Sequence, residues 1–99
     1  MTNVQVLIPN TMDDSEANRI LTHQSLSMSE AKGNIEVKVS KGAIMSPGGP
    51  TPYGMAMTAS WDSLENFIAW AQSPAGDKYK DVLLENGAIL VFYEVEDGR

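Results

Sequence analysis

The sequence predicts an α+β domain in which strands and helices follow the order βαββαβ. Apolar and polar residues alternate at 3–8 and 35–39, which is the pattern of strands buried on one face. Two stretches with apolar residues at helical spacing each follow an acidic capping residue. This order predicts the split-βαβ, ferredoxin-like arrangement: a four-stranded antiparallel sheet with both helices on one face. A length of 99 residues fits a single domain over 1–99.

The first half of the chain supplies a strand, a helix and a second strand. We expect the first strand at 3–8. Asp13 and Glu16 have the spacing of a capping box, in which each side chain satisfies a free backbone N–H, so we expect a helix from about 14 to 27. The alternation at 35–39 then predicts the second strand.

The second half of the chain starts with a wide loop. The segment 46–52 contains three prolines, which lack the N–H that a sheet requires, so it predicts a loop between neighbouring antiparallel strands. The third strand begins at Tyr53. Asp62 with Glu65 predicts a second capping box, and Ser60 is the alternative cap for this second helix.

The remaining elements follow the second helix. Pro74 ends that helix, because the residue before a proline avoids helical geometry. A short helical turn is expected within 77–85. The last strand, 88–95, is almost continuously apolar, which predicts burial on both faces and a central position in the sheet. We expect 96–99 to be a solvated tail.

The two faces of the predicted sheet differ in polarity. Beneath the helices we expect Ile35, Val37, Val39, Ile89, Val91, Tyr93 and Val95. The opposite face would carry Gln5, Leu7, Glu36, Lys38, Thr58, Leu90 and Phe92. Because that face is too apolar for open water and too polar for a dry core, we expect two copies to pack sheet to sheet as a homodimer.

Composition and charge exclude several classes of partner. The net charge of −6, with 13 acidic and 7 scattered basic residues, disfavours nucleic acid and anionic membranes. The chain has no cysteine, which excludes disulfides and a thiol nucleophile and suits the cytoplasm. The N-terminus lacks the basic region of a signal peptide, and no apolar run approaches the ~20 residues of a membrane span.

One group of residues resembles a known family. Tyr53 and Ala56, then Asp62-Ser63-Leu64-Glu65, then Ser73-Pro74-Ala75-Gly76 and Asp81, look like the EthD family, named for ethyl tert-butyl ether degradation. The resemblance implies a dimeric α+β barrel. It also implies a small homodimeric protein that binds a small, mostly apolar organic molecule, in degradative or secondary metabolism, with no single reaction defined.

The N-terminal half resembles the same family less specifically. Asp14-Ser15-Glu16-Ala17 is similar to the start of its first helix, and His23 falls where the family usually has a histidine. Ser40-Lys41-Gly42 resembles the end of its second strand. The usual aromatic residues of the first helix are absent, and Gln24-Ser25 replaces the residues that usually follow the histidine.

A second family of the same superfamily is also similar. Trp61, Ser63, Glu65, Phe67, Trp70 and Ser73 match the spacing of the antibiotic-biosynthesis monooxygenases. That family expects an aromatic residue and often a histidine after Ser73, and this chain has Pro74-Ala75-Gly76, which favours the EthD-like interpretation. The alternative function is a cofactor-independent monooxygenase or a cyclase. A homodimer with a filled core and no ligand is the third hypothesis, so the sequence leaves open whether the protein is an oxidoreductase, a lyase or no enzyme.

Two residues are the candidate catalytic groups. His23 is the only histidine, and its ordinary pKa near neutrality suits a general base; it could also be a single axial ligand to haem. Its helical position beside Glu16 and Arg19 favours a solvated role instead. Tyr53 could supply a hydroxyl, as could Tyr79, although both are equally compatible with structural roles.

The candidate ligand-binding residues are apolar. They are Trp61, Trp70, Phe67, Met55 and Met57. Core packing alone would explain most of them, but Trp70 lies off the apolar stripe of its helix, which suggests a pocket mouth or a dimer edge. With one histidine and no cysteine, a zinc or copper site is short of ligands, so we expect no metal and no cofactor.

Overall fold

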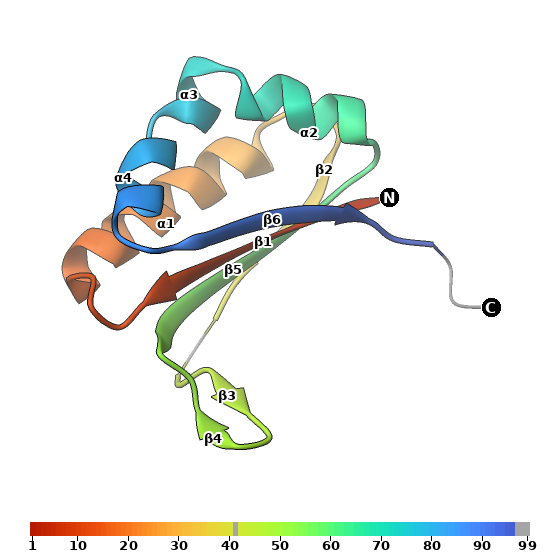
Figure 1. Cartoon of the computed structure of the whole chain (residues 1–99). Coiled ribbons are helices and arrows are strands. Elements are labelled where there is room, and N and C mark those ends of the chain that lie inside the picture. Colours follow the sequence, from red (N-terminus) through yellow and green to blue (C-terminus); the bar gives the residue numbers. More distant parts are fainter. Residues whose placement is uncertain (41, 97–99) are drawn as a thin grey trace.

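The computed structural model describes residues 1–40 and 42–96 and shows one antiparallel sheet with helices on one face (Figure 1). The elements are β1 (Thr2–Pro9), α1 (Asp14–Ser29), β2 (Asn34–Val39), β3 (Met45–Ser46), β4 (Gly49–Pro50), β5 (Tyr53–Trp61), α2 (Leu64–Ala71), α3 (Pro74–Asp77), α4 (Lys80–Glu85) and β6 (Ile89–Glu94). The predicted ferredoxin-like α+β fold is confirmed. Lys41 of the segment 40–42 and residues 97–99 of the predicted tail lie outside the described residues.

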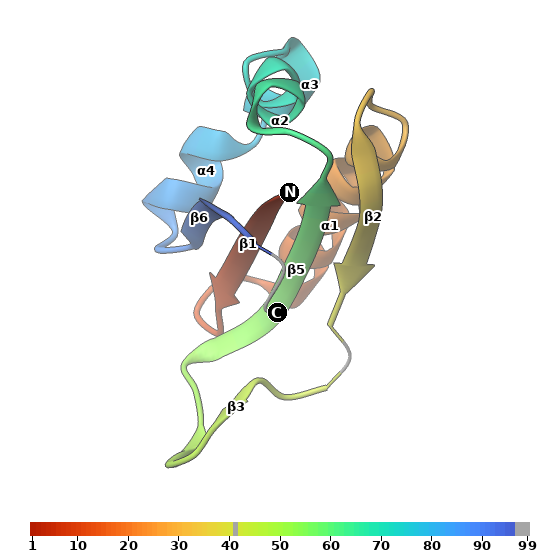
Figure 2. The same ribbon diagram turned by 90° about the vertical axis from the view of Figure 1, so that its right-hand side faces the viewer.

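The predicted loop at 46–52 contains regular structure. Met45 pairs with Pro50 and Ser46 with Gly49, which makes the short hairpin of β3 and β4. The hairpin extends from the end of the sheet opposite to α2 and α3 (Figure 2). The expectation that this segment does not pair was therefore wrong, although the strands on either side of it, β2 and β5, are antiparallel neighbours as predicted.

The order of strands in the sheet is β2-β5-β1-β6, with every neighbouring pair antiparallel. This order corrects the prediction that the last strand is central, because β6 lies at an edge. The apolar residues of β6 are not buried on both faces of the sheet within one chain, because Phe92 is 52% exposed and Tyr93 is 44% exposed. The continuous apolar run therefore reflects two apolar faces and not two flanking strands.

The register of β6 also reverses its predicted faces. Val4 is opposite Phe92 and Val6 is opposite Leu90. Since Val4 and Val6 are buried beneath the helices, Leu90 and Phe92 share that face. Ile89, Val91, Tyr93 and Val95, which we expected beneath the helices, thus alternate to the other side of the strand. A run that is apolar at every position carries no alternation from which its register could be predicted.

The strand β2 follows its prediction except at its start. Val37 and Val39 are opposite Ala59 and Met57, on the side that faces the helices. Ile35 falls within a bulge between Asn34 and Glu36 and is 57% exposed, so its predicted place beneath the helices was wrong. The extra residue of a bulge leaves the regular alternation of the strand.

The hydrophobic core lies between the sheet and the helices. On α1 the buried residues recur at helical spacing: Ala17, Ile20, Leu21, Gln24 and Met28. On β1 every second residue from Thr2 to Ile8 is buried, which confirms the predicted alternation. Within residues 1–40 and 42–96, no helix is long and apolar enough to cross a membrane.

The two predicted helix caps differ in outcome. The backbone N–H of Glu16 donates to Asp13 Oδ2 at 3.0 Å, so Asp13 caps α1 as predicted. The second cap is Ser63, whose Oγ accepts from the N–H of Asn66 at 3.2 Å, and not Asp62 or Ser60. Asp62 instead accepts from the side-chain amide of Asn66. Because Asp62 and Ser63 are adjacent and both are residue types that cap helices, the spacing does not show which of the two is the cap.

Candidate ligand cavity

A cavity of about 310 Å³ lies between the sheet and the helices. Apolar side chains form most of its lining: Val4, Val6, Met57 and Leu90 from the sheet, Met28 from α1, Phe67, Ile68 and Ala71 from α2, and Leu83 from α4. Beside them are Trp70 and two residues with flexible polar side chains, Gln24 and Lys80. This is the arrangement of a small-molecule site, which is concave and mostly apolar with a few polar groups.

An aromatic cluster forms one wall of the cavity. The rings of Phe67 and Phe92 have centroids 5.1 Å apart, which connects α2 to β6. The ring centroids of Trp70 and Trp61 lie 5.9 Å apart. The indole N–H of Trp70 donates to Ser27 Oγ at 3.0 Å, and this bond holds its ring against α1. The wall is therefore fixed by contacts from three different elements.

The predicted ligand-binding residues divide into two groups. Phe67, Trp70 and Met57 line the cavity. Trp61 is fully buried behind this wall, with its indole N–H unpaired among the described residues, and Met55 packs against the core outside the lining. A ligand-binding role stays a prediction for all five residues, and the geometry favours the first three.

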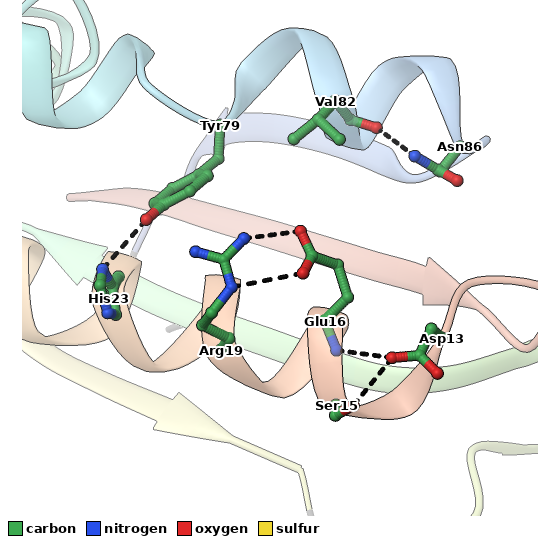
Figure 3. Close-up of polar contacts among 8 residues, drawn as sticks. All are labelled: Asp13, Ser15, Glu16, Arg19, His23, Tyr79, Val82 and Asn86. Atoms are coloured by element: carbon green, nitrogen blue, oxygen red, sulfur yellow. Dashed lines mark hydrogen bonds and ion pairs between the residues drawn. The ribbon is translucent and has the colours of Figure 1, made fainter.

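His23 lies outside the cavity lining and pairs with Tyr79. Its Nδ1 is 3.0 Å from the Tyr79 hydroxyl, which reaches it from the segment before α4 (Figure 3). Which of the two groups donates depends on the histidine tautomer. The histidine is exposed, whereas Tyr79 is only 6% exposed, so the phenol is the buried member of the pair.

Two cations accompany this pair. Arg19 and Lys78 lie 5.7 and 5.3 Å from the centroid of the Tyr79 ring. Arg19 is also bound to Glu16, with Nη2 and Oε1 2.6 Å apart, and this contact raises the pKa of the Arg19 guanidinium. The charge of Arg19 is therefore already balanced, and the surroundings of His23 are those of a surface network.

Tyr53 is distant from the cavity along its own strand. It begins β5, opposite Pro9, whereas the aromatic wall adjoins the other end of the strand at Trp61. The structure thus brings neither His23 nor Tyr53 into the lining of the cavity, and their catalytic roles stay predictions.

Gln24 is a polar lining residue that the sequence reasoning did not identify. It is 6% exposed, lies on the buried stripe of α1 and lines the cavity. A signal was present in the sequence, because Gln24 follows Ile20 by four residues and precedes Met28 by four. A polar residue at a position that should be apolar is a candidate site residue.

The described residues do not provide the ligands of a metal or haem site. Residues 1–40 and 42–96 contain no group of three or more His, Cys, Asp or Glu that could hold a metal ion. A haem would need an apolar cavity beside its axial ligand, and His23 is exposed and outside the lining. The residues near His23 therefore do not fit the haem hypothesis.

Comparison with known proteins gives a fold. No protein-family model and no curated protein matches the sequence. An EthD family protein from Bacillus halodurans has a similar structure, with a TM-score of 0.69 at 14% identity over 97% of this chain and 99% of that one. SnoaB, a cofactor-independent oxygenase from Streptomyces nogalater, is also similar, with a TM-score of 0.70 at 9% identity over 97% of this chain and 92% of that one. A dimeric ferredoxin-like protein of unknown function from Thermobifida fusca has a TM-score of 0.68 at 13% identity, over 95% of this chain and 90% of that one.

These similarities confirm the ferredoxin-like fold that the sequence predicted. At such identities a structural likeness establishes the fold, and function has to be argued from the site. The EthD protein and the oxygenase match this chain almost equally well, so the fold does not separate the two families.

Proposed function

We propose that this chain is an EthD-like protein that binds a small, mostly apolar organic molecule between its helices and its sheet. The observation that carries the proposal is the cavity of about 310 Å³ beside α2, a volume at the lower end of the range for small-molecule sites. The setting would be degradative or secondary metabolism, as the EthD resemblance implies. A cytoplasmic location, which the lack of cysteine suits, is part of the same proposal.

The composition of the lining favours binding over catalysis. Among the described residues that line the cavity there is no histidine and no carboxylate. The Lys80 ammonium lies 3.1 Å from Asp77 Oδ1, and the Trp70 N–H is bound to Ser27. An apolar ligand would therefore be held mainly by shape and by the release of water from apolar surface.

A cofactor-independent monooxygenase or a cyclase is the alternative from the enzyme class. In that case an aromatic substrate would be positioned by Trp70, the tryptophan that lines the cavity. No contact in the described residues favours this alternative over binding. A structural homodimer without a ligand, the third hypothesis, requires a filled core, whereas a cavity is present.

The homodimer is part of the proposal and rests on the open face of the sheet. The corrected register places Ile89, Val91 and Tyr93 on that face, beside Leu7 and Ala56. The open face is therefore more apolar than the sequence predicted. Val91 and Tyr93 are 42% and 44% exposed within one chain, opposite the polar Gln5 and Asn3, and a second copy that packs sheet to sheet would cover them.

The binding proposal is tested by filling the cavity. Ala71 lines it from α2, so the phenyl ring of Ala71→Phe would occupy space that the ligand needs. Aromatic and ether compounds that raise the melting temperature of the wild-type protein should bind Ala71→Phe at least about tenfold more weakly, since a steric exclusion removes most apolar contacts. Thermal-shift screening identifies the compounds that bind, and isothermal titration calorimetry then measures their affinity for the two proteins.

Ala69→Phe is the matched control, because Ala69 is exposed on the same helix and lies outside the lining. It should bind the same compounds as the wild type. Equal binding to all three proteins would place the ligand elsewhere and overturn the proposal. The absence of any stabilising compound would favour the structural homodimer.

A further inference from the structure

One polar group in the cavity has no role in the binding of a purely apolar molecule. Gln24 carries a primary amide with two donors and one acceptor, and its side chain is more than nine-tenths buried. No described residue forms a hydrogen bond with this amide. Its neighbours in the lining, Met28 and Met57, cannot replace such a bond because a thioether is only a weak acceptor.

The other polar groups of the lining are already paired. Lys80 is bound to Asp77 and Trp70 to Ser27. Among the described residues, the one fully enclosed side-chain N or O atom without a partner is Trp61 Nε1, so the amide atoms of Gln24 are not sealed off and can be reached from the cavity that this residue lines. The amide is thus a described polar group of the lining that can donate to an oxygen of an entering ligand.

We propose that Gln24 is the polar anchor of the cavity and that the ligand is a neutral molecule with an apolar body and one carbonyl or hydroxyl oxygen. This inference rests on the proposed function. The Gln24 NH₂ would donate to that oxygen, while the apolar lining encloses the body of the molecule. A carboxylate is disfavoured, because the neighbouring cation, Lys80, is neutralised by Asp77 and the chain carries a net charge of −6.

The test compares three probes with one ring skeleton: indane, its ketone indanone and its acid indane carboxylate. Isothermal titration calorimetry with the wild-type protein should show that indanone binds about tenfold more tightly than indane, the gain expected of one buried hydrogen bond. The carboxylate should bind more weakly than both. In Gln24→Met, which retains the length of the side chain, indanone should bind no more tightly than indane.

Gln72→Met is the control, since Gln72 is exposed at the end of α2, and it should retain the preference for the ketone. If Gln24→Met fails to fold, measurements on the wild-type protein alone still test the role of Gln24. With ¹³C-labelled indanone, the carbonyl carbon of the bound ketone should resonate downfield of its position in an apolar solvent such as cyclohexane, as a carbonyl that accepts a hydrogen bond does.

The outcomes separate the two proposals. Equal binding of indane and indanone to the wild type, or a bound carbonyl that resonates as it does in an apolar solvent, would overturn the role of Gln24 and leave the proposed function intact. Tightest binding of the carboxylate would identify Lys80 as the anchor and overturn this inference. If none of the three probes, nor any compound of the wider screen, binds, the proposed function fails and the inference fails with it.

Discussion

Gln24 occupies a position on α1 at which the helical spacing calls for an apolar side chain. Ile20, Leu21 and Met28 surround it on the same stripe and are buried with it. Trp70 is the converse case, because it lies off the stripe of α2 and still lines the cavity, held there by Ser27. At the scale of single residues, the site is thus marked by side chains that depart from the local pattern.

Asp13 gives a prediction on pH. The Ser15 hydroxyl at 2.8 Å and the Glu16 N–H at 3.0 Å both donate to its carboxylate and lower the pKa of Asp13. Because the pKa of Asp13 is lower in the folded state, its charged carboxylate stabilises the folded protein at every pH above the pKa of the unfolded state. This stabilisation is lost as the pH falls below about 4 and passes through the lower pKa of the folded state. Asp13→Ala should therefore lower the melting temperature at pH 7 and have little effect at pH 2.

Asp13→Asn is the comparison for that prediction. An asparagine accepts the same hydrogen bond at the start of a helix and does not titrate in this range. It should keep the cap at pH 7 and reduce the loss of stability on acidification. A melting temperature of Asp13→Ala that falls equally short of the wild type at both pH values would show that the carboxylate charge is not involved.

The break between α2 and α3 is the element on which the resemblance to EthD depends most. Ser73 caps α3 by accepting from the N–H of Gly76 at 3.2 Å, and its own hydroxyl donates to the Trp70 carbonyl at 2.5 Å. Pro74 occupies the first turn of α3, where its missing N–H costs nothing. The motif thus turns the chain tightly against the end of α2, beside the cavity.

Gly76→Ala tests this packing. A Cβ at Gly76 would overlap the backbone carbonyl of Trp70, which no side-chain rotation can relieve. We expect the variant to lose about 1–3 kcal/mol of unfolding free energy, the usual cost of overpacking. Urea denaturation measures this loss. Gly48→Ala is the control, because a Cβ there meets only Ser46 Oγ at 3.9 Å, and a comparable loss in that variant would contradict the packing argument.

The elements could be predicted where one local signal dominated. Alternation gave β1 and most of β2, and Asp13 gave the start of α1. Where two signals competed, the prediction failed, as at Asp62 and Ser63. The cavity could be anticipated only as a class of site, because its shape depends on how three strands and four helices pack, and a one-dimensional pattern does not contain that information.

At the scale of the molecule, the position of β6 links the cavity to the proposed dimer. One face of the strand contributes Leu90 and Phe92 to the cavity, and the other carries Ile89 and Tyr93 into the open face. A second copy on the open face would press on the same strand that closes the cavity. Dimer formation and ligand binding should therefore influence each other through β6.

Tyr93→Glu tests the dimer. Tyr93 lies on the open face of the edge strand β6, so in a sheet-to-sheet dimer a carboxylate there would be buried without a partner, which is strongly unfavourable. Sedimentation should show a dimer for the wild type at micromolar concentration and a monomer for this variant. Leu26→Glu, which changes an exposed apolar residue on α1, should remain dimeric. A wild-type monomer would contradict the proposal directly.

The aromatic wall gives the molecule an optical reporter of its own. Of the two tryptophans, Trp70 borders the cavity, and Trp61 is completely enclosed. Indole emission shifts to shorter wavelength when water leaves its surroundings, so an entering ligand would change the emission of Trp70, the tryptophan that borders the cavity. Fluorescence of the unlabelled protein would thus report directly what fraction of its cavities is filled.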